Sequence, residues 1–494
     1  MARTSFEFNL GKAAPDARRL DEESPLRILV IGDLSGGAGG GAGGGLAARR
    51  PLEVDIDSFD QVLRRIAPRY TTPRGEEIAF GELDDFHPDA LVKRVRAFER
   101  LRELKQRLGN SATFSAAAEE FRAQLNAPAV EASRAAPAPS ENDSDTLSRL
   151  LGGSGGAAPA ASAASGINAF IRDVVAEHVQ PDAPAHQSQY VAAADAAIGA
   201  EMNSILHDPR FQSLEAAWRG VYWLVSNLEL GETLRLSLLD ATKAELLEDL
   251  TANQDDLSRT VTYKTLVEAA QVAGAEPWSL VVGAYEFGPH VEDIAVLATV
   301  GAIAAQAGAA FIASASPELA GAPSYANADP SSWQEAEGDR YAAWNALRRS
   351  AMAPHIALAA PRVLMRLPYG KSTDRVSAFD LDELGAERTH ESYLWGGAAF
   401  ACALLIGRAF TEHGWEMTPG DALDVDDLPA HTYEEDGEKR MQACAETYLS
   451  ERAGQALIER GLVPLLSYAN RNAVRVMRFQ SIAQPPRELA GPWR

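Results

Sequence analysis

The chain has 494 residues, 46% hydrophobic and 23% charged, which is enough for two or three domains with sizeable cores. Its 46 Lys and Arg against 69 Asp and Glu give a net charge of −23. This charge repels phosphate backbones, so no nucleic-acid partner is expected. Cys402 and Cys444 are too few for a disulfide framework, which favours a reducing compartment, the cytoplasm.

The N-terminal 20 residues are polar and lack the apolar core of a secretory signal. The most apolar stretches, at 280–282 and 398–406, are too short to cross a bilayer, so we expect no membrane insertion.

The N-terminal region, residues 1–110, is predicted to form one segment with two ordered pieces. Residues 26–31 form an apolar run typical of a buried strand, and Gly32-Asp33 ends it. A Gly/Ala tract at 36–45 predicts a flexible surface loop. Pro88 opens a pattern of apolar residues at three- and four-residue spacing, which predicts one amphipathic helix up to Leu108.

Residues 111–166 are rich in Ala, Pro, Ser and Gly, apart from apolar pieces near Phe121 and at 147–151. This composition is typical of a disordered segment, and we interpret it as a flexible interdomain linker.

Residues 167–494 alternate predicted strands and helices, which favours an α/β fold with mixed sheets flanked by helices; α+β remains an alternative. A helix begins after His207-Asp208-Pro209, and Leu234 to Leu238 alternate as in a half-buried strand. A capping box at 242–245 starts the next helix. Further strands are predicted at 280–285, 311–313 and 355–360, and a further helix at 291–307.

Three motifs follow one another in the N-terminal region. They are Ser-Pro-Leu-Arg-Ile-Leu-Val-Ile-Gly-Asp at 24–33, Pro-Leu-Glu-Val-Asp-Ile-Asp-Ser-Phe-Asp at 51–60 and Leu-Asp-Asp-Phe-His-Pro-Asp at 83–89. In order and spacing they resemble the small subunit of the type VI secretion contractile sheath.

Motifs in the remainder resemble the large subunit of the same sheath. They lie at 205–220, 285–287, 313–317, 362–370 (ending in Arg-Leu-Pro-Tyr-Gly) and 393–396, with weaker matches at 428–433, 451–452, 461–465 and 479–481.

The resemblance implies a fused small and large subunit that acts by assembly and conformational contraction, without enzymatic chemistry or cofactors. It implies sheath subunits, an inner tube protein, baseplate components and an AAA+ recycling ATPase as partners. In the family this ATPase engages an exposed helix. The candidate equivalent here is an apolar patch of Leu147, Leu150 and Leu151, which could equally be a passive apolar spot in the linker.

Two departures from the family leave an alternative open. The two subunits are usually separate chains, and the large one continues well past the position of Ser481 into a stretch that weaves protomers together. If those donor strands are absent, a non-polymerising accessory or capping factor that binds sheath or baseplate is the alternative.

Motifs for bond chemistry are weak. Gly370-Lys371-Ser372 lacks the Gly-rich turn of a phosphate loop, and Gly152-Gly153-Ser154-Gly155-Gly156 matches a nucleophile elbow only within the predicted linker. His207 and His431 are interpreted as structural. The acidic residues at 421–427 and 434–436 lack the spacing of a calcium loop and predict a solvated face. We expect no metal site.

Five aromatic side chains could form either a core or an interface hot spot, with a core favoured. They are Trp218, Tyr222, Trp223, Trp395 and Trp415.

Overall fold

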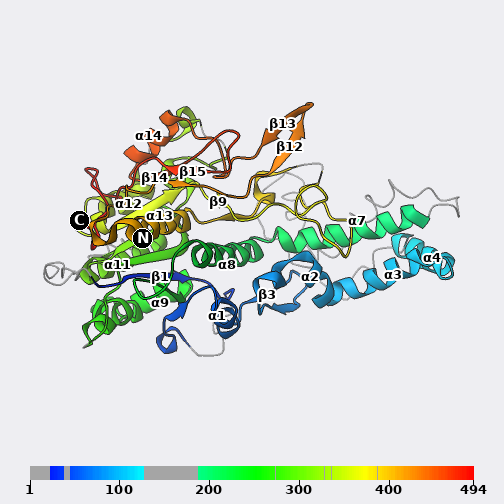
Figure 1. The fold of residues 1–494 in the computed structure, drawn as a ribbon, viewed down its shortest axis with the longest axis horizontal. Helices are drawn as coiled ribbons and strands as arrows, with labels where there is room; N and C mark the ends of the chain where they lie inside the picture. The colour runs from blue at the N-terminus through cyan, green and yellow to red at the C-terminus, as the bar shows by residue number, and fades with distance from the viewer. Residues whose placement is uncertain are drawn as a thin grey trace, which may run out of the picture. The chain divides into compact units, whose positions relative to one another are not determined.

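The computed structural model describes residues 23–37, 45–126, 187–272, 274–326, 329–334, 337–385 and 388–493. The chain divides into two compact units (Figure 1). Unit 1 comprises Met1–His87, Leu206–Tyr369 and Leu384–Arg494, and unit 2 comprises Pro88–Ile205 and Gly370–Glu383. No helix in the described part of the chain has the length and hydropathy needed to span a membrane.

Nine described strands of unit 1 form one mixed sheet in the order β11-β15-β14-β8-β7-β6-β1-β5-β2. The run from β14 to β5 is parallel, and β2, β15 and β11 are antiparallel at the two edges. The strands are β1 (Leu26–Gly32), β2 (Leu52–Val54), β5 (Leu234–Asp240), β6 (Leu280–Phe287), β7 (Ala310–Ala315), β8 (Ile356–Ala360), β11 (Asp424–Val425), β14 (Val463–Ser467) and β15 (Val474–Val476).

Helices cover both faces of this sheet, as the notably apolar parallel strands require. One face packs against α13, which also contacts α8, and the other carries α11 with α9 and α12 beside it (Figure 1). The helices of unit 1 are α1 (Phe59–Ile66), α8 (Pro209–Asn227), α9 (Lys243–Ala252), α10 (Val261–Tyr263), α11 (Val291–Ala307), α12 (Ala342–Arg348), α13 (Ala398–His413) and α14 (Glu451–Glu459). The predicted α/β class is therefore confirmed.

Three small two-stranded sheets accompany the main sheet. They are β3 (Arg69–Thr71) with β4 (Glu77–Ala79), β9 (Val363–Leu364) with β10 (Trp395–Gly396), and β12 (Thr432–Glu435) with β13 (Glu438–Met441). The β12–β13 hairpin projects from the rest of unit 1 (Figure 1).

Unit 2 is helical and has its own apolar core, which includes Leu104, Leu108, Phe121 and Tyr190. Its helices are α2 (Pro88–Arg94), α3 (Glu99–Gly109), α4 (Phe114–Asn126) and α7 (Gln187–Leu206, whose last residue belongs to unit 1). The segment 370–383 completes the unit.

Several local predictions are confirmed. Asp208 caps α8 by accepting from the Arg210 amide, with Pro209 at the first helical position. Thr242 and Glu245 form the predicted capping box of α9.

Three predictions need correction. The strand β5 is buried on both faces rather than half-buried, because helices lie on both sides of the sheet. The single helix predicted from Pro88 to Leu108 is interrupted, since Val95 adopts an extended conformation between α2 and a 3-10 turn that leads into α3. Helix α4 lies inside the predicted linker 111–166, because its apolar face joins the core of unit 2. The boundaries 1–110, 111–166 and 167–494 stay a prediction.

Candidate functional site

The central feature of unit 1 is the position of β1 in the sheet. This N-terminal strand pairs in parallel with β5 along its whole length, from Leu26 opposite Leu234 to Gly32 opposite Asp240. Its other edge pairs with β6. β2 then adds to the far side of β5 in the antiparallel direction. Two N-terminal strands thus flank β5, and the sheet is built from segments more than 200 residues apart in sequence.

Close packing fits β1 to its neighbours. At Gly32, a Cβ atom would lie 2.8 Å from the Ala284 Cβ of β6, so a larger side chain would force the strands apart. At the start of β1, the Arg27 guanidinium lies 3.9 Å from the ring centroid of Trp278 in a cation–π contact. Side-chain contacts therefore hold β1 in the sheet in addition to its backbone hydrogen bonds.

A buried polar cluster joins the two segments at the carboxyl end of β1. The amides of Leu34 and Ser35 both donate to Asp240 Oδ1 at 2.9 Å. Arg49 donates to both carboxylate oxygens of Glu245, at 3.0 and 2.7 Å, and its Nη1 lies 3.4 Å from Asp240 Oδ2. Burial raises the pKa of Asp240. Burial opposes ionisation of Glu245 as well, but its bonds to Arg49 lower its pKa.

The Asp240 cluster lies at the carboxyl ends of β1 and β5, where α/β sheets often bind ligands. Open α/β sheets bind ligands outside the carboxyl ends of their strands, at the point where strand order reverses. Here β1 is that point, because β5 lies on one side of it and β6 on the other. The acidic groups at this edge are engaged by Arg49 of the N-terminal segment, so the edge works as a contact between segments.

An aromatic contact joins the same two segments on the α8 side. Trp218 of α8 is fully buried, and its Nε1 donates to the Leu34 carbonyl at 2.9 Å. The ring of Phe59 from α1 meets the Trp218 ring edge-on, with centroids 5.8 Å apart. Tyr222, one turn further along α8, also contacts Phe59 but is 41% exposed.

A second buried charge cluster joins α8 to the Arg-Leu-Pro-Tyr-Gly motif at 366–370. Glu215 of α8 has no exposed surface, and its Oε1 accepts from Arg366 at 2.9 Å and from Arg219 at 2.8 Å. Arg366 also stacks 4.1 Å from the ring centroid of Tyr369. Burial opposes ionisation of Glu215, but the charges of Arg366 and Arg219 lower its pKa. The N-terminal segment contributes His87, whose ring meets that of Tyr369 edge-on.

A third cluster ties the loop before β9 to the region after β13. The Glu446 side chain is 1% exposed, and its Oε1 accepts from Arg362 Nη2 at 2.7 Å. His390 Nε2 lies 3.0 Å from the same oxygen, and the Arg362 amide donates to Oε2. Burial opposes ionisation of Glu446, but the bonds from His390 and Arg362 lower its pKa.

Comparisons with known proteins match these two segments separately. The family profile described as EvpB/VC_A0108, tail sheath N-terminal domain, matches residues 188–483, which is more than half of the chain. The chain belongs to this tail sheath family. The profile described as Type VI secretion system, VipA, VC_A0107 or Hcp2 matches residues 12–134. The resemblance to both sheath subunits is therefore confirmed.

Two curated relatives from Pseudomonas aeruginosa show the same division. The type VI secretion system sheath protein TssC1 is 34% identical over 311 residues, which cover 60% of this chain and 61% of TssC1. The sheath protein TssB1 is 30% identical over 134 residues, which cover 24% of this chain and 77% of TssB1. The chain thus spans about three fifths of TssC1. Strand β1 lies in the VipA-like match, and β5 and β6 lie in the VipB-like match.

Two of the candidates for bond chemistry, Gly370-Lys371-Ser372 and His431, make local structural contacts. Gly370-Lys371-Ser372 forms a turn closed by the Gly370 amide and the Asp374 carbonyl, and no helix starts there. His431 is buried and shares a 2.8 Å hydrogen bond with the Tyr393 hydroxyl. No described group of three or more His, Cys, Asp or Glu could hold a metal ion.

The acidic residues at 421–427 are partly paired. Asp424 binds Arg475 and Asp426 binds Arg471, both at the surface. Gly152–Gly156 and the candidate ATPase patch of Leu147, Leu150 and Leu151 lie outside the described residues, so that patch stays a prediction.

The five aromatic residues differ in burial, which places Trp218 and Trp395 in the core, whereas an interface role stays a prediction. Trp218 and Trp395 are buried, Trp223 and Trp415 are half-buried, and Tyr222 is exposed. No sequence pattern predicts the two buried carboxylates, Glu215 and Glu446, since isolated acidic residues usually lie at the surface.

The Glu446 cluster predicts an acid-sensitive contribution to stability. A carboxyl whose folded pKa is lowered from 4.5 stabilises the fold above that value, and this stability is lost as pH falls through the folded pKa. We measure the free energy of unfolding by denaturant titration from pH 7 to pH 3. Below about pH 4.5, this free energy is expected to fall less steeply in the Glu446→Gln variant than in the wild type. The two slopes differ by at most about 1.4 kcal/mol per pH unit. Equal slopes for both proteins would contradict this role.

Proposed function

We propose that the chain is a single-chain protomer of a type VI secretion contractile sheath, in which the VipA-like and VipB-like segments fold together as one subunit. The observation that carries the proposal is β1, which pairs with β5 on one side and β6 on the other. A strand inside a sheet contributes backbone hydrogen bonds on both edges, so the two segments are parts of one folding unit. The Asp240 and Trp218 contacts add side-chain links across the same junction.

In this proposal the protomer works by assembly and conformational change rather than by making or breaking bonds. Its partners are other sheath subunits, an inner tube protein, the baseplate and an AAA+ ATPase, in the cytoplasm. The charge clusters around the buried carboxylates Asp240, Glu215 and Glu446 support such a role, because buried groups that are paired favour one arrangement of the segments that carry them.

Two measurements on the full chain test the proposal in sequence. First, a protease site is placed within residues 127–186 and the purified chain is cut there. The two fragments are expected to elute together in native size-exclusion chromatography, because β1 stays paired with β5 and β6. Separation without denaturant would refute the fused subunit, and the uncut chain is the control.

Second, negative-stain electron microscopy of the full-length chain is expected to show tubes at micromolar concentration. A small particle that joins or terminates sheaths only when separate sheath subunits are added would refute the protomer and support the accessory or capping factor instead.

A further inference from the structure

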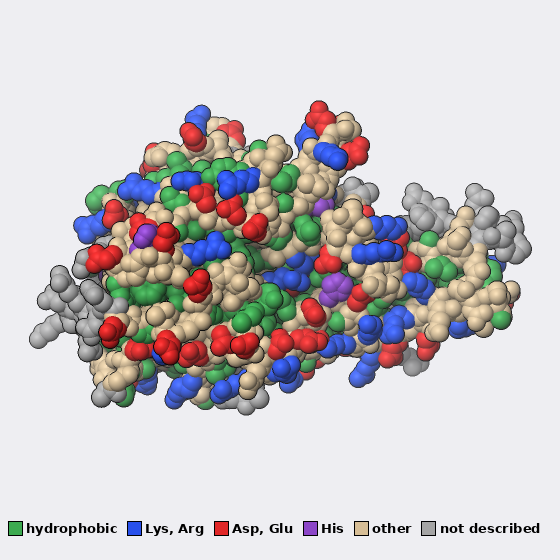
Figure 2. Space-filling view, viewed as in Figure 1, with side chains coloured by type: hydrophobic (Ala, Val, Ile, Leu, Met, Phe, Trp, Pro, Cys, Tyr) green, Lys and Arg blue, Asp and Glu red, His purple; other side chains and the backbone are tan. Residues whose placement is uncertain are grey.

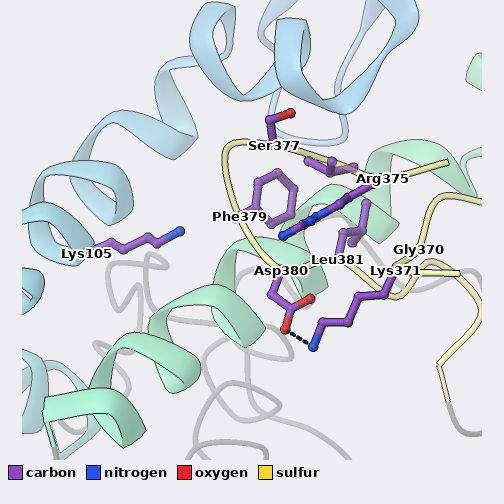
Figure 3. A pocket seen from close by; sticks show the side chains of 9 residues that line it. Lys105, Gly370, Lys371, Arg375, Ser377, Phe379, Asp380 and Leu381 are labelled. Carbon is purple, nitrogen blue, oxygen red and sulfur yellow. Dashed lines mark ion pairs between the residues drawn. The ribbon is translucent and has the colours of Figure 1, made fainter.

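Unit 2 contains a cavity of about 260 Å³ between helix α3 and the segment 370–383. Three cationic side chains reach it from different sides: Lys105 of α3, Lys371 and Arg375 (Figure 3). Lys371 Nζ lies 2.6 Å from Asp380 Oδ2, and Lys105 Nζ lies 2.7 Å from Asp195 Oδ1. Arg375 is exposed and has no carboxylate partner among the described residues. Three positive and two negative groups leave one net positive charge.

The cavity wall is held in place by both buried side chains and backbone contacts. Val376, Phe379 and Leu381 anchor the segment, each with 6% or less of its surface exposed. The amides of Ser377 and Ala378 donate to the Asp89 carboxylate at 2.8–3.0 Å. A wall fixed in this way loses little conformational entropy when a ligand binds.

The charge of the cavity indicates the class of ligand. One net positive charge matches a single carboxylate, whereas a di- or triphosphate would bring several negative charges beside Asp380 of the cavity wall. The turn at Gly370-Lys371-Ser372 also lacks a following helix, whose amides would bind a phosphate. A carboxylate would lie beside Arg375 and compete with Asp380 for Lys371.

The β12–β13 hairpin carries carboxylates suited to such a cavity. Asp436 and Gly437 adopt left-handed conformations, with φ of 54° and 77°, and form a tight two-residue turn. Glu435 and Glu438 lie directly opposite one another across the turn, a destabilising arrangement that a cation relieves. Arg440 and Arg388 pair with Glu435, whereas Glu438 and Asp436 are exposed without an ion pair in the described part of the chain. Figure 2 shows acidic and basic side chains on the projecting hairpin.

We propose that the cavity around Arg375 receives a carboxylate from the β12–β13 hairpin of a second copy of this chain. The contact deepens the proposed function, on which it rests, by naming one surface through which protomers recognise each other. The match between a cationic cavity and a rigid acidic turn gives the contact specificity and makes it sensitive to salt.

The test is binding of a fluorescent, cyclised peptide of residues 431–442 to the full-length chain, followed by anisotropy. The wild-type chain is expected to bind the peptide more weakly as salt rises. Arg375→Glu is expected to weaken binding roughly tenfold or more, while the control Arg65→Glu, an exposed arginine of α1, leaves it unchanged. A peptide with Glu434, Asp436 and Glu438 changed to lysine is expected to restore binding to Arg375→Glu. This rescue shows that the variant is folded.

Three outcomes would overturn the inference. They are equal binding by wild type and Arg375→Glu, equal binding of a peptide whose three acids are changed to amides, and tighter binding of inorganic phosphate or ATP than of the peptide. Failure of the hairpin contact and failure of the proposed function give different results. If the chain forms tubes but does not bind the peptide, only the hairpin contact is refuted. If it binds the peptide but forms no tubes, only the proposed sheath protomer is refuted.

Discussion

Replacing Glu215 with alanine is expected to lower the free energy of unfolding by about 3–5 kcal/mol, because the change removes one partner of a buried charge pair, the Glu215 carboxylate that Arg366 contacts at 2.9 Å. Arg366 is only 6% exposed, so water cannot replace the lost partner without rearrangement. Denaturant titrations followed by circular dichroism measure the change.

The matched control for Glu215 is Glu77→Ala. Glu77 also pairs with an arginine, Arg69, but both side chains are about half exposed. Its loss is expected to change stability by less than about 1 kcal/mol. Similar midpoints for the two variants would show that the Glu215 cluster contributes no more than a surface pair.

The second large effect is expected at Trp218. Trp218→Ala removes a fully buried indole from the contact between α8 and the N-terminal segment, and should cost about 3–5 kcal/mol. Trp218→Phe keeps most of the apolar volume but leaves the Leu34 carbonyl without its donor, at a cost of about 1–3 kcal/mol.

Tyr222→Ala is the control for Trp218, because it lies on the same helix and contacts the same Phe59 ring but is exposed. It should change stability by clearly less than Trp218→Ala. If Trp218→Ala unfolds at the same denaturant concentration as Tyr222→Ala, the buried aromatic contact does not hold the two segments together.

The sequence predicted helix starts and strands well where the interactions that form them span only a few residues. The Asp208-Pro209 start of α8 and the Thr242 capping box need only side chains within one turn. The apolar run of β1 likewise showed a buried strand. The half-buried interpretation of β5 failed because the polar residue Ser237 lies in the interior, 5% exposed, where the alternation suggested solvent.

The features that define the site act over long range. Nothing near residues 26–31 indicates that the strand pairs with β5 and β6, because its partners lie more than 200 residues away. The Glu215 pairing with Arg366 joins α8 to a motif 151 residues later. Resemblance to the sheath family supplied both motifs, but not their contact.

The place of β1 also sets an order for synthesis and folding. β1 leaves the ribosome before β5, and each β5 residue follows its β1 partner, such as Leu234 after Leu26, by about 208 residues. At about 5–20 residues per second, this apolar strand waits about 10–40 s before its first long-range partner exists. Proteins whose contacts are so distant in sequence fold slowly, and their apolar surface is exposed to aggregation until folding is complete. Because both segments lie on one chain, the pairing of β1 with β5 is unimolecular. β1 therefore pairs with β5 of its own chain rather than with β5 of another copy.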